Sequence, residues 1–124
     1  MNSIYLKMED LKINQNTHKI EINGKKCKNI NCYFKQVLSA LGIKYNKKIT
    51  ICDYLDLMCE VSTFKSDDVS FIIYNYKEFL KNDEKIRDLI ISTFKFDILP
   101  FWEDLDNNDN IKNFNLYLLE ENGF

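Results

Sequence analysis

The residues of this chain that could do chemistry are first of all a set of carboxylates. Asp53, Asp56 and Glu60 lie at positions i, i+3 and i+7 of a segment whose apolar residues recur at helical spacing. Residues three and four apart are neighbours on a helix, so we expect these three carboxylates on one exposed face. A pair such as Asp53 and Asp56 could act in acid–base catalysis or hold a metal ion. An exposed helix face favours a solvated surface instead, so no metal site is expected.

A second group of acidic residues follows two aromatic residues near the C-terminus. Residues 101–110 contain Trp102, Glu103, Asp104 and Asp106. Aromatic side chains beside charged ones are typical of the contacts that dominate protein interfaces. We therefore expect these four residues to belong to a protein-binding surface.

The cysteines and the histidine give weaker indications of a functional site than the carboxylates do. The spacings of Cys27, Cys32, Cys52 and Cys59 match neither a zinc site nor a thioredoxin motif. We expect four free thiols, mostly buried as small apolar residues. The single histidine, His18, is expected at the tip of a turn, in solvent.

No nucleotide-binding, zinc-protease or nucleophile-elbow motif is present, and three glycines cannot build a phosphate-binding loop. We therefore expect a protein that is not an enzyme and needs no cofactor. The alternative from another class is a small ligand-binding module or enzyme that uses a thiol or a carboxylate.

The length and composition of the chain predict one domain, residues 1–124. No apolar run approaches the roughly 18 residues that a membrane helix needs, and no export signal is recognisable, so we expect a cytoplasmic protein.

Charge is divided unevenly along the chain. Residues 1–52 carry ten lysines against three acidic residues, whereas residues 53–124 carry sixteen acidic residues against seven basic ones. This division favours two opposed faces, one of which could steer a charged partner. Direct nucleic-acid binding is not expected, because arginine is nearly missing and the net charge is −2.

The predicted elements are strands at residues 19–23, 69–75 and 114–119, separated by helices. Asn29 or Asn31 is expected to cap the first helix, and Thr50 with Asp53 forms a capping box for the second. Pro100 is expected to end the third helix. Alternating Leu11 and Ile13 predict an antiparallel edge strand at residues 11–14 that forms a hairpin with residues 19–23.

Strands separated by helical crossovers predict an α/β fold. We expect a small mixed, mainly parallel sheet of three to four strands, with three helices packed on it. Residues 1–18 form an arm and edge strand, in which residues 4–8 could be a short strand or an ordered arm, and residues 19–124 form the core.

From residue 19 onward the chain resembles the barstar family, the intracellular inhibitors of secreted ribonucleases. The resemblance is carried by a first strand that ends in Asn23-Gly24, a helix that precedes a tyrosine-bearing loop at Tyr45, and an acidic second helix from Asp53 to Met58. A middle strand at residues 71–76, a helix and a short last strand complete it. The family implies a protein that plugs a nuclease active site with that loop and second helix. The corresponding residues here are Tyr45, Asp53 and Asp56, with Tyr54 and Glu60 beside them.

The expected function is therefore a protein-binding inhibitor that neutralises a nuclease, as an immunity protein of a toxin system. A phage-encoded inhibitor of a bacterial defence nuclease is the alternative. Carboxylates on a rigid helix suit either role, because they can mimic phosphates and steer association.

Overall fold

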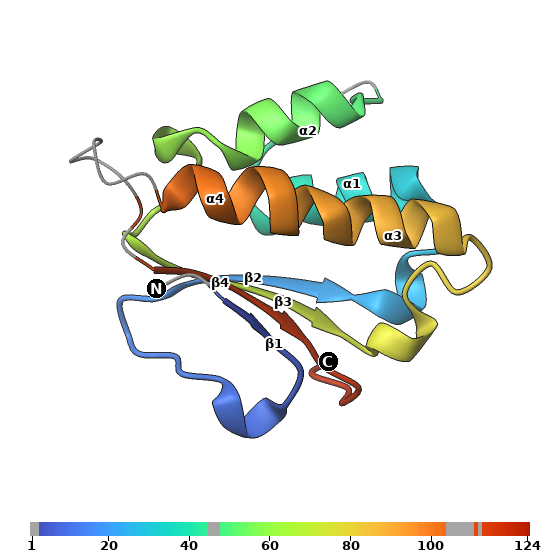
Figure 1. Cartoon of the computed structure of the whole chain (residues 1–124), viewed down its shortest axis with the longest axis horizontal. Helices are drawn as coiled ribbons and strands as arrows, with labels where there is room; N and C mark the ends of the chain where they lie inside the picture. Colours follow the sequence, from blue (N-terminus) through green and yellow to red (C-terminus); the bar gives the residue numbers. More distant parts are fainter. Residues whose placement is uncertain (1–2, 45–47, 104–110, 112) are drawn as a thin grey trace.

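The computed structural model describes residues 3–44, 48–103, 111 and 113–124. These residues form one sheet in the order β1-β4-β3-β2, in which every neighbouring pair of strands is parallel. The strands are β1 (Ile4–Tyr5), β2 (His18–Asn23), β3 (Asp68–Tyr74) and β4 (Asn113–Leu118). The long helices all lie on one side of the sheet (Figure 1). The predicted α/β class, with helices packed on a mainly parallel sheet, is confirmed.

β3 lies second from one edge and is apolar on both faces. Phe71 and Ile73 pack into the core beneath the helices, and Ile72 and Tyr74 pack into a smaller cluster on the opposite face. Successive side chains of a strand point to opposite faces, so a continuous apolar run is what this position requires.

Three helices cover the upper face: α1 (Ile30–Ala40), α2 (Ile51–Met58) and α3 (Glu84–Thr93). Each begins at a side chain that accepts a hydrogen bond from the first turn. For α1 the cap is Asn29, whose Oδ1 accepts from the backbone N of Cys32 at 2.9 Å. The expected caps Asn29 and Thr50 are therefore confirmed.

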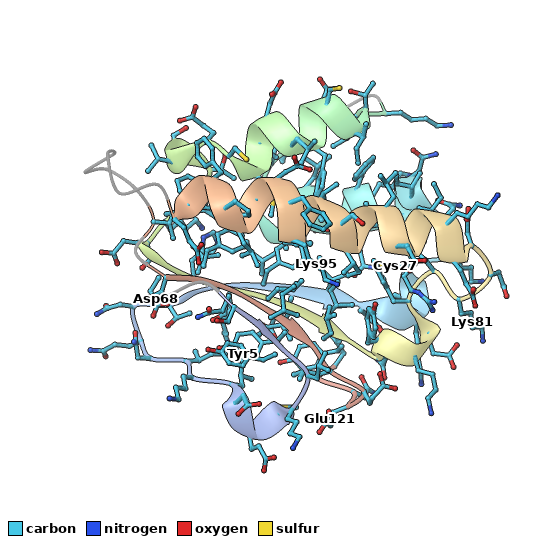
Figure 2. All side chains as sticks on the ribbon, viewed as in Figure 1. Tyr5, Cys27, Asp68, Lys81, Lys95 and Glu121 are labelled. Atoms are coloured by element: carbon cyan, nitrogen blue, oxygen red, sulfur yellow. The ribbon has the colours of Figure 1, made fainter. Side chains whose placement is uncertain are left out.

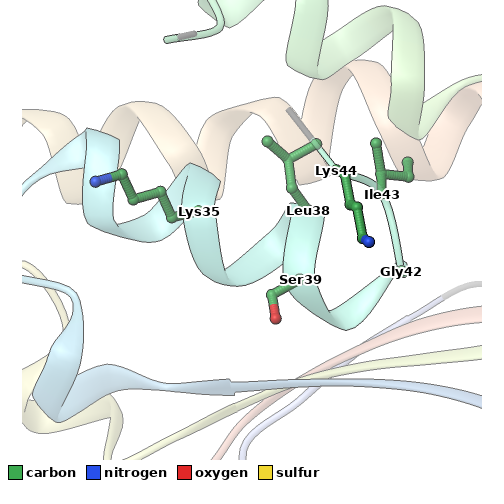
Figure 3. A pocket seen from close by; sticks show the side chains of 6 residues that line it. All are labelled: Lys35, Leu38, Ser39, Gly42, Ile43 and Lys44. Atoms are coloured by element: carbon green, nitrogen blue, oxygen red, sulfur yellow. The ribbon is translucent and has the colours of Figure 1, made fainter. Parts of the chain in front are cut away.

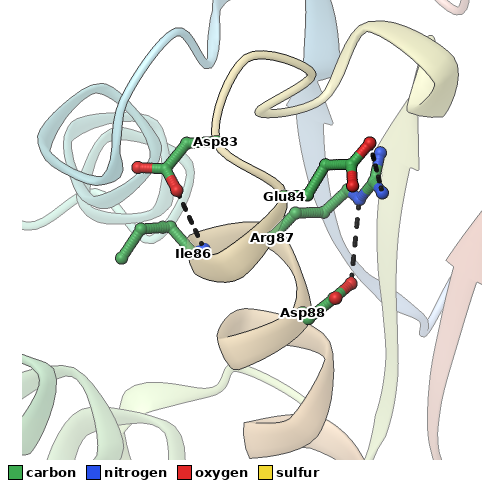
Figure 4. Close-up of polar contacts among 5 residues, drawn as sticks. All are labelled: Asp83, Glu84, Ile86, Arg87 and Asp88. Carbon is green, nitrogen blue, oxygen red and sulfur yellow. Dashed lines mark hydrogen bonds and ion pairs between the residues drawn. The ribbon is translucent and has the colours of Figure 1, made fainter.

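α3 begins at Asp83, whose Oδ1 accepts a hydrogen bond from the backbone N of Ile86 at 3.2 Å (Figure 4). Arg87 lies one turn later, with its guanidinium 3.9 Å from carboxylate oxygens of both Glu84 and Asp88. Both carboxylates are well exposed, so these pairs contribute little to stability.

The third helix does not end before Pro100, contrary to the sequence expectation. A π-helical turn, η5 (Phe94–Ile98), continues α3, and α4 (Leu99–Trp102) follows without a break. The backbone N of Leu99 bonds to the carbonyl of Phe94, five residues back, and Leu99 keeps helical angles. The wider turn accommodates the proline, which lacks an N–H and would clash in a regular turn.

The predicted hairpin is also absent. Residues 11–14 form no strand, and the backbone N of Thr17 closes a turn on the carbonyl of Asn14 at 3.1 Å. Both residues are tied by their side chains to Asp68. The extra strand is instead β1, parallel to β4 at the far edge. Leu11 packs under the sheet, so its alternation with Ile13 reflects burial rather than strand pairing.

The lower face of the sheet is covered by the segment between β1 and β2. Tyr5 stacks on Tyr117 with ring centres 5.1 Å apart, and Met8 and Leu11 pack beside them. Figure 2 shows Tyr5 on this side of the sheet, away from the helices.

His18 is a strand residue, not a solvated turn residue as expected. It is partly buried as the first residue of β2, its ring meets Phe64 edge-on, and its Nδ1 accepts from the backbone N of Lys65 at 3.1 Å. Burial, and then the charge of Lys65, lowers the pKa of His18.

Among the described residues, no helix combines the length and the apolar character that crossing a membrane requires.

Candidate protein-interaction surface

α2 is held in shape at its start by a reciprocal cap. Thr50 Oγ1 accepts from the backbone N of Asp53 at 3.1 Å, and Asp53 Oδ2 accepts from the backbone N of Thr50 at 2.9 Å. The predicted capping box is confirmed. One of the proposed binding carboxylates, Asp53, therefore also has a structural task.

The inner face of α2 is anchored by two fully buried residues, Tyr54 and Met58. The Tyr54 hydroxyl lies 2.7 Å from the Tyr33 hydroxyl of α1, and burial raises the pKa of both phenols. Met58 offers its carbonyl to Nε1 of Trp102 at 3.0 Å. These contacts fix α2 against α1 and α4, which makes it a rigid support for its outer face.

Two aromatic residues predicted to contact a partner are core residues instead. Tyr54 has no exposed surface and Trp102 is 4% exposed. Trp102 is buried because the helix continues through Pro100, which turns the indole inward to stack over Phe114 and to meet Phe64. An indole N–H needs an acceptor when buried, and the end of α2 supplies one.

The carboxylates of the outer face are exposed, as expected. Asp53, Asp56 and Glu60 are all exposed, but Glu60 lies beyond the end of α2. It precedes the short helix η3 (Val61–Thr63) and accepts from the backbone N of Ser62 at 3.3 Å. Asp56 makes no hydrogen bond or ion pair with the described parts of the chain, so its carboxylate is available to a partner.

η5 and α4 add charge and aromatic surface beside α2. Burial, followed by the nearby carboxylates of Asp97 and Asp56, raises the pKa of the Cys59 thiol to about 11. These two exposed carboxylates thus lie near one thiol, although they come from different helices. Glu103 is exposed at the end of α4. We call Asp53, Asp56, Glu60, Asp97 and Glu103 the acidic surface.

Sequence reasoning missed Asp97 and two exposed aromatic residues. Phe96 is 74% exposed and Phe101 is 41% exposed. Phe96 falls outside the apolar stripe of the third helix, and this was the signal that could have identified it. Aromatic residues are enriched at interfaces, so these two exposed side chains are candidates for contact with a partner.

Three of the predicted binding residues lie outside the described residues. They are Tyr45 in the loop before α2, and Asp104 and Asp106 after α4.

The cysteines are free thiols, as expected. Cys27 is buried, Cys32 and Cys59 are partly buried, and only Cys52 is exposed. Burial, with Cys32 nearby, raises the pKa of Cys27 to about 12. Because the thiolate is the nucleophile, Cys27 and Cys59 are poorly suited to catalysis near neutral pH.

Several hollows lie on the described surface. One of about 340 Å³ lies at the end of α1 and is lined by two lysines and a serine among apolar residues (Figure 3): Lys35, Leu38, Ser39, Gly42, Ile43 and Lys44. Within the described residues, no three His, Cys, Asp or Glu side chains form a group that could hold a metal ion.

Comparison of the chain with known protein families, with curated proteins and with solved structures found no match. The resemblance to the barstar family is therefore neither supported nor opposed by these comparisons.

Proposed function

We propose that this protein acts by binding another protein through the acidic surface, and that the partner is a nuclease which it inhibits. The observation that carries the proposal is α2 itself, a capped and core-anchored helix that holds exposed carboxylates at Asp53 and Asp56. A helix that is already fixed needs little further ordering of its backbone on binding, which favours affinity.

A nuclease is the partner class that this chemistry fits. An enzyme that cleaves nucleic acid binds phosphates in a basic cleft, and Asp53 and Asp56 on α2, with Glu60 just beyond its end, offer that cleft charges of the same sign as phosphate. Exposed Phe96 and Phe101 would supply apolar contacts beside these charges. From β2 onward, with α3 to α4 taken as one continuous helix, the elements follow the order strand, two helices, strand, helix, strand, which is the order on which the barstar resemblance rests.

The toxin–immunity role remains the preferred setting, with inhibition of a bacterial defence nuclease as the alternative. In both the protein works in the cytoplasm, where the nuclease threatens the cell's own or the invader's nucleic acid. Cys27 and Cys59 do not support the enzyme alternative, because burial raises the pKa of both thiols and so disfavours the reactive thiolate.

The test is capture of the partner with tagged protein from cells of its own source, after nucleic acid has been digested and in moderate salt. The proposal predicts one nuclease in stoichiometric amount, whose cleavage of nucleic acid stops when the purified protein is added back. Capture of no nuclease, or of one that stays fully active in the complex, would contradict it.

A further inference from the structure

We propose that the free edge of β2 pairs with the same edge of a second copy of this chain, in an antiparallel arrangement centred on Ile20. The two sheets would then join into one continuous sheet. The interface lies on β2, not on the acidic surface, so the inference stands apart from the proposed function.

β2 is an edge strand of the sheet. Among the described residues, β2 has one neighbouring strand, β3, and its other edge has none. An unpaired edge presents backbone N–H and C=O groups that can bond to another strand.

The hydrogen bonds of Asn23 show which residues of β2 point these backbone groups outward. The backbone N of Asn23 donates to Gln36 Oε1 at 2.8 Å, and Gln36 Nε2 donates to the carbonyl of Asn23 at 3.1 Å. Gln36 lies on α1, so both backbone groups of Asn23 face away from β3. Backbone groups alternate along a strand, so those of Lys19 and Glu21 face the same free edge.

The backbone groups at both ends of this edge already have hydrogen-bond partners. Gln36 closes it at Asn23, and at the other end the backbone N of Thr17 is bonded to Asn14. Lys19 and Glu21 remain as the two residues with outward backbone groups. A strand from a second copy therefore has a window of two residues in which to pair.

The two outward-facing residues determine the register in which two copies could pair. If Lys19 of one copy lies opposite Glu21 of the other, both outward residues of both copies form hydrogen-bonded pairs, with Ile20 on the two-fold axis. Pairing Lys19 with Lys19, or Glu21 with Glu21, would use fewer backbone groups and place like charges opposite each other, which is destabilising.

The side chains agree with this register. Lys19 and Glu21 lie on the same face of the sheet, with Nζ and Oε1 3.8 Å apart and both side chains partly exposed. In the paired edges, these two opposite charges would face the same two in reverse order. Complementary charge thus selects a second copy of this chain over an arbitrary strand.

The test is sedimentation equilibrium of the purified chain over a concentration series that reaches about 1 mM, because a short edge makes a small interface. The proposal predicts that the mass rises from 14.8 kDa toward twice that value. A mass that stays at one chain throughout the series would overturn it.

Charge variants identify the register. Glu21→Lys and Lys19→Glu should each remain monomeric, because like charges then face each other. An equimolar mixture of the two should associate at least as well as the unaltered chain, since every facing pair is again opposite, and the double swap should self-associate. Circular dichroism confirms that each variant is folded. Self-association of either single variant, or failure of the mixture to associate, would overturn the proposed register.

Discussion

Several side chains of this molecule have a structural task that limits how their function can be tested. Asp53 is both an exposed carboxylate of the acidic surface and half of the capping box that starts α2. Replacing it would change the helix and the surface together. Asp56 has no such task among the described contacts, so it is the better residue for testing binding.

The capping box gives a prediction at this scale. Thr50→Ala should lower the free energy of unfolding by about 1 kcal/mol, because it leaves the backbone N of Asp53 without its acceptor. Chemical denaturation measures the change. Thr50→Ser keeps the hydroxyl and should lose much less, and equal losses in both variants would show that the hydroxyl is not what matters.

His18 gives a prediction about pH. Its pKa is lowered from 6.5 in the folded protein, so folding favours the neutral ring that accepts from Lys65. This contribution to stability is fully present above pH 6.5 and is lost as pH falls through 6.5 toward the folded pKa. His18→Gln removes the titration, so the stability difference between the two proteins should change only in this window.

NMR offers a direct check, since the chain has a single histidine. A folded-state pKa at or above 6.5 would contradict the burial that the structure gives His18.

Elements are where prediction from sequence succeeded and failed most clearly. The core strands and the helix caps were predictable, because apolar runs and capping residues act over short distances. The π-helical turn was not, since a proline normally ends a helix and local sequence gives no sign that a wider turn will absorb it. That one error also misplaced Trp102, whose burial depends on the helix continuing.

The prediction of an edge strand at residues 11–14 failed for another reason. Leu11 and Ile13 alternate as a half-buried strand does, yet burial under a sheet can produce the same pattern. Only the tertiary contacts of Asn14 and Thr17 with Asp68 decide between the two. Of the acidic surface, Asp53, Asp56, Glu60 and Glu103 were expected from sequence, and the structure shows that their side chains are exposed. Asp97 and Phe96 were missed because their exposure depends on how η5 packs.

The junction after β2 gives a prediction about packing. Gly24 packs against the backbone at the end of β3, and a Cβ there would collide with the carbonyl oxygen of Asn75. Gly24→Ala should therefore cost about 3 kcal/mol or prevent folding, since backbone cannot easily move aside. Gly42→Ala is the control, because it adds a Cβ into open space at a φ of +72° and should cost about 1 kcal/mol. Equal losses would contradict the close approach.

At the scale of the whole molecule, the division of charge along the chain is only partly a division in space. The acidic surface gathers carboxylates from α2, η5 and α4, all from the acidic second part of the chain. The lysine-rich first part supplies β2 and α1, and Lys19 of β2 lies beside Glu21. We therefore propose a basic partner for the acidic surface and a second copy of the chain for the β2 edge.

The measurement that tests the central claim most directly is the affinity of the captured nuclease for Asp56→Lys. Asp56 is exposed and no described contact depends on it, so the variant should fold normally. Glu120→Lys makes the same charge change on the C-terminal segment, away from α2 (Figure 1). We predict that Asp56→Lys weakens binding at least about tenfold and reduces its salt dependence, because a charge facing a basic cleft is reversed. Glu120→Lys should bind like the unaltered protein. Equal affinity of all three proteins would contradict the assignment of the acidic surface as the nuclease-binding site.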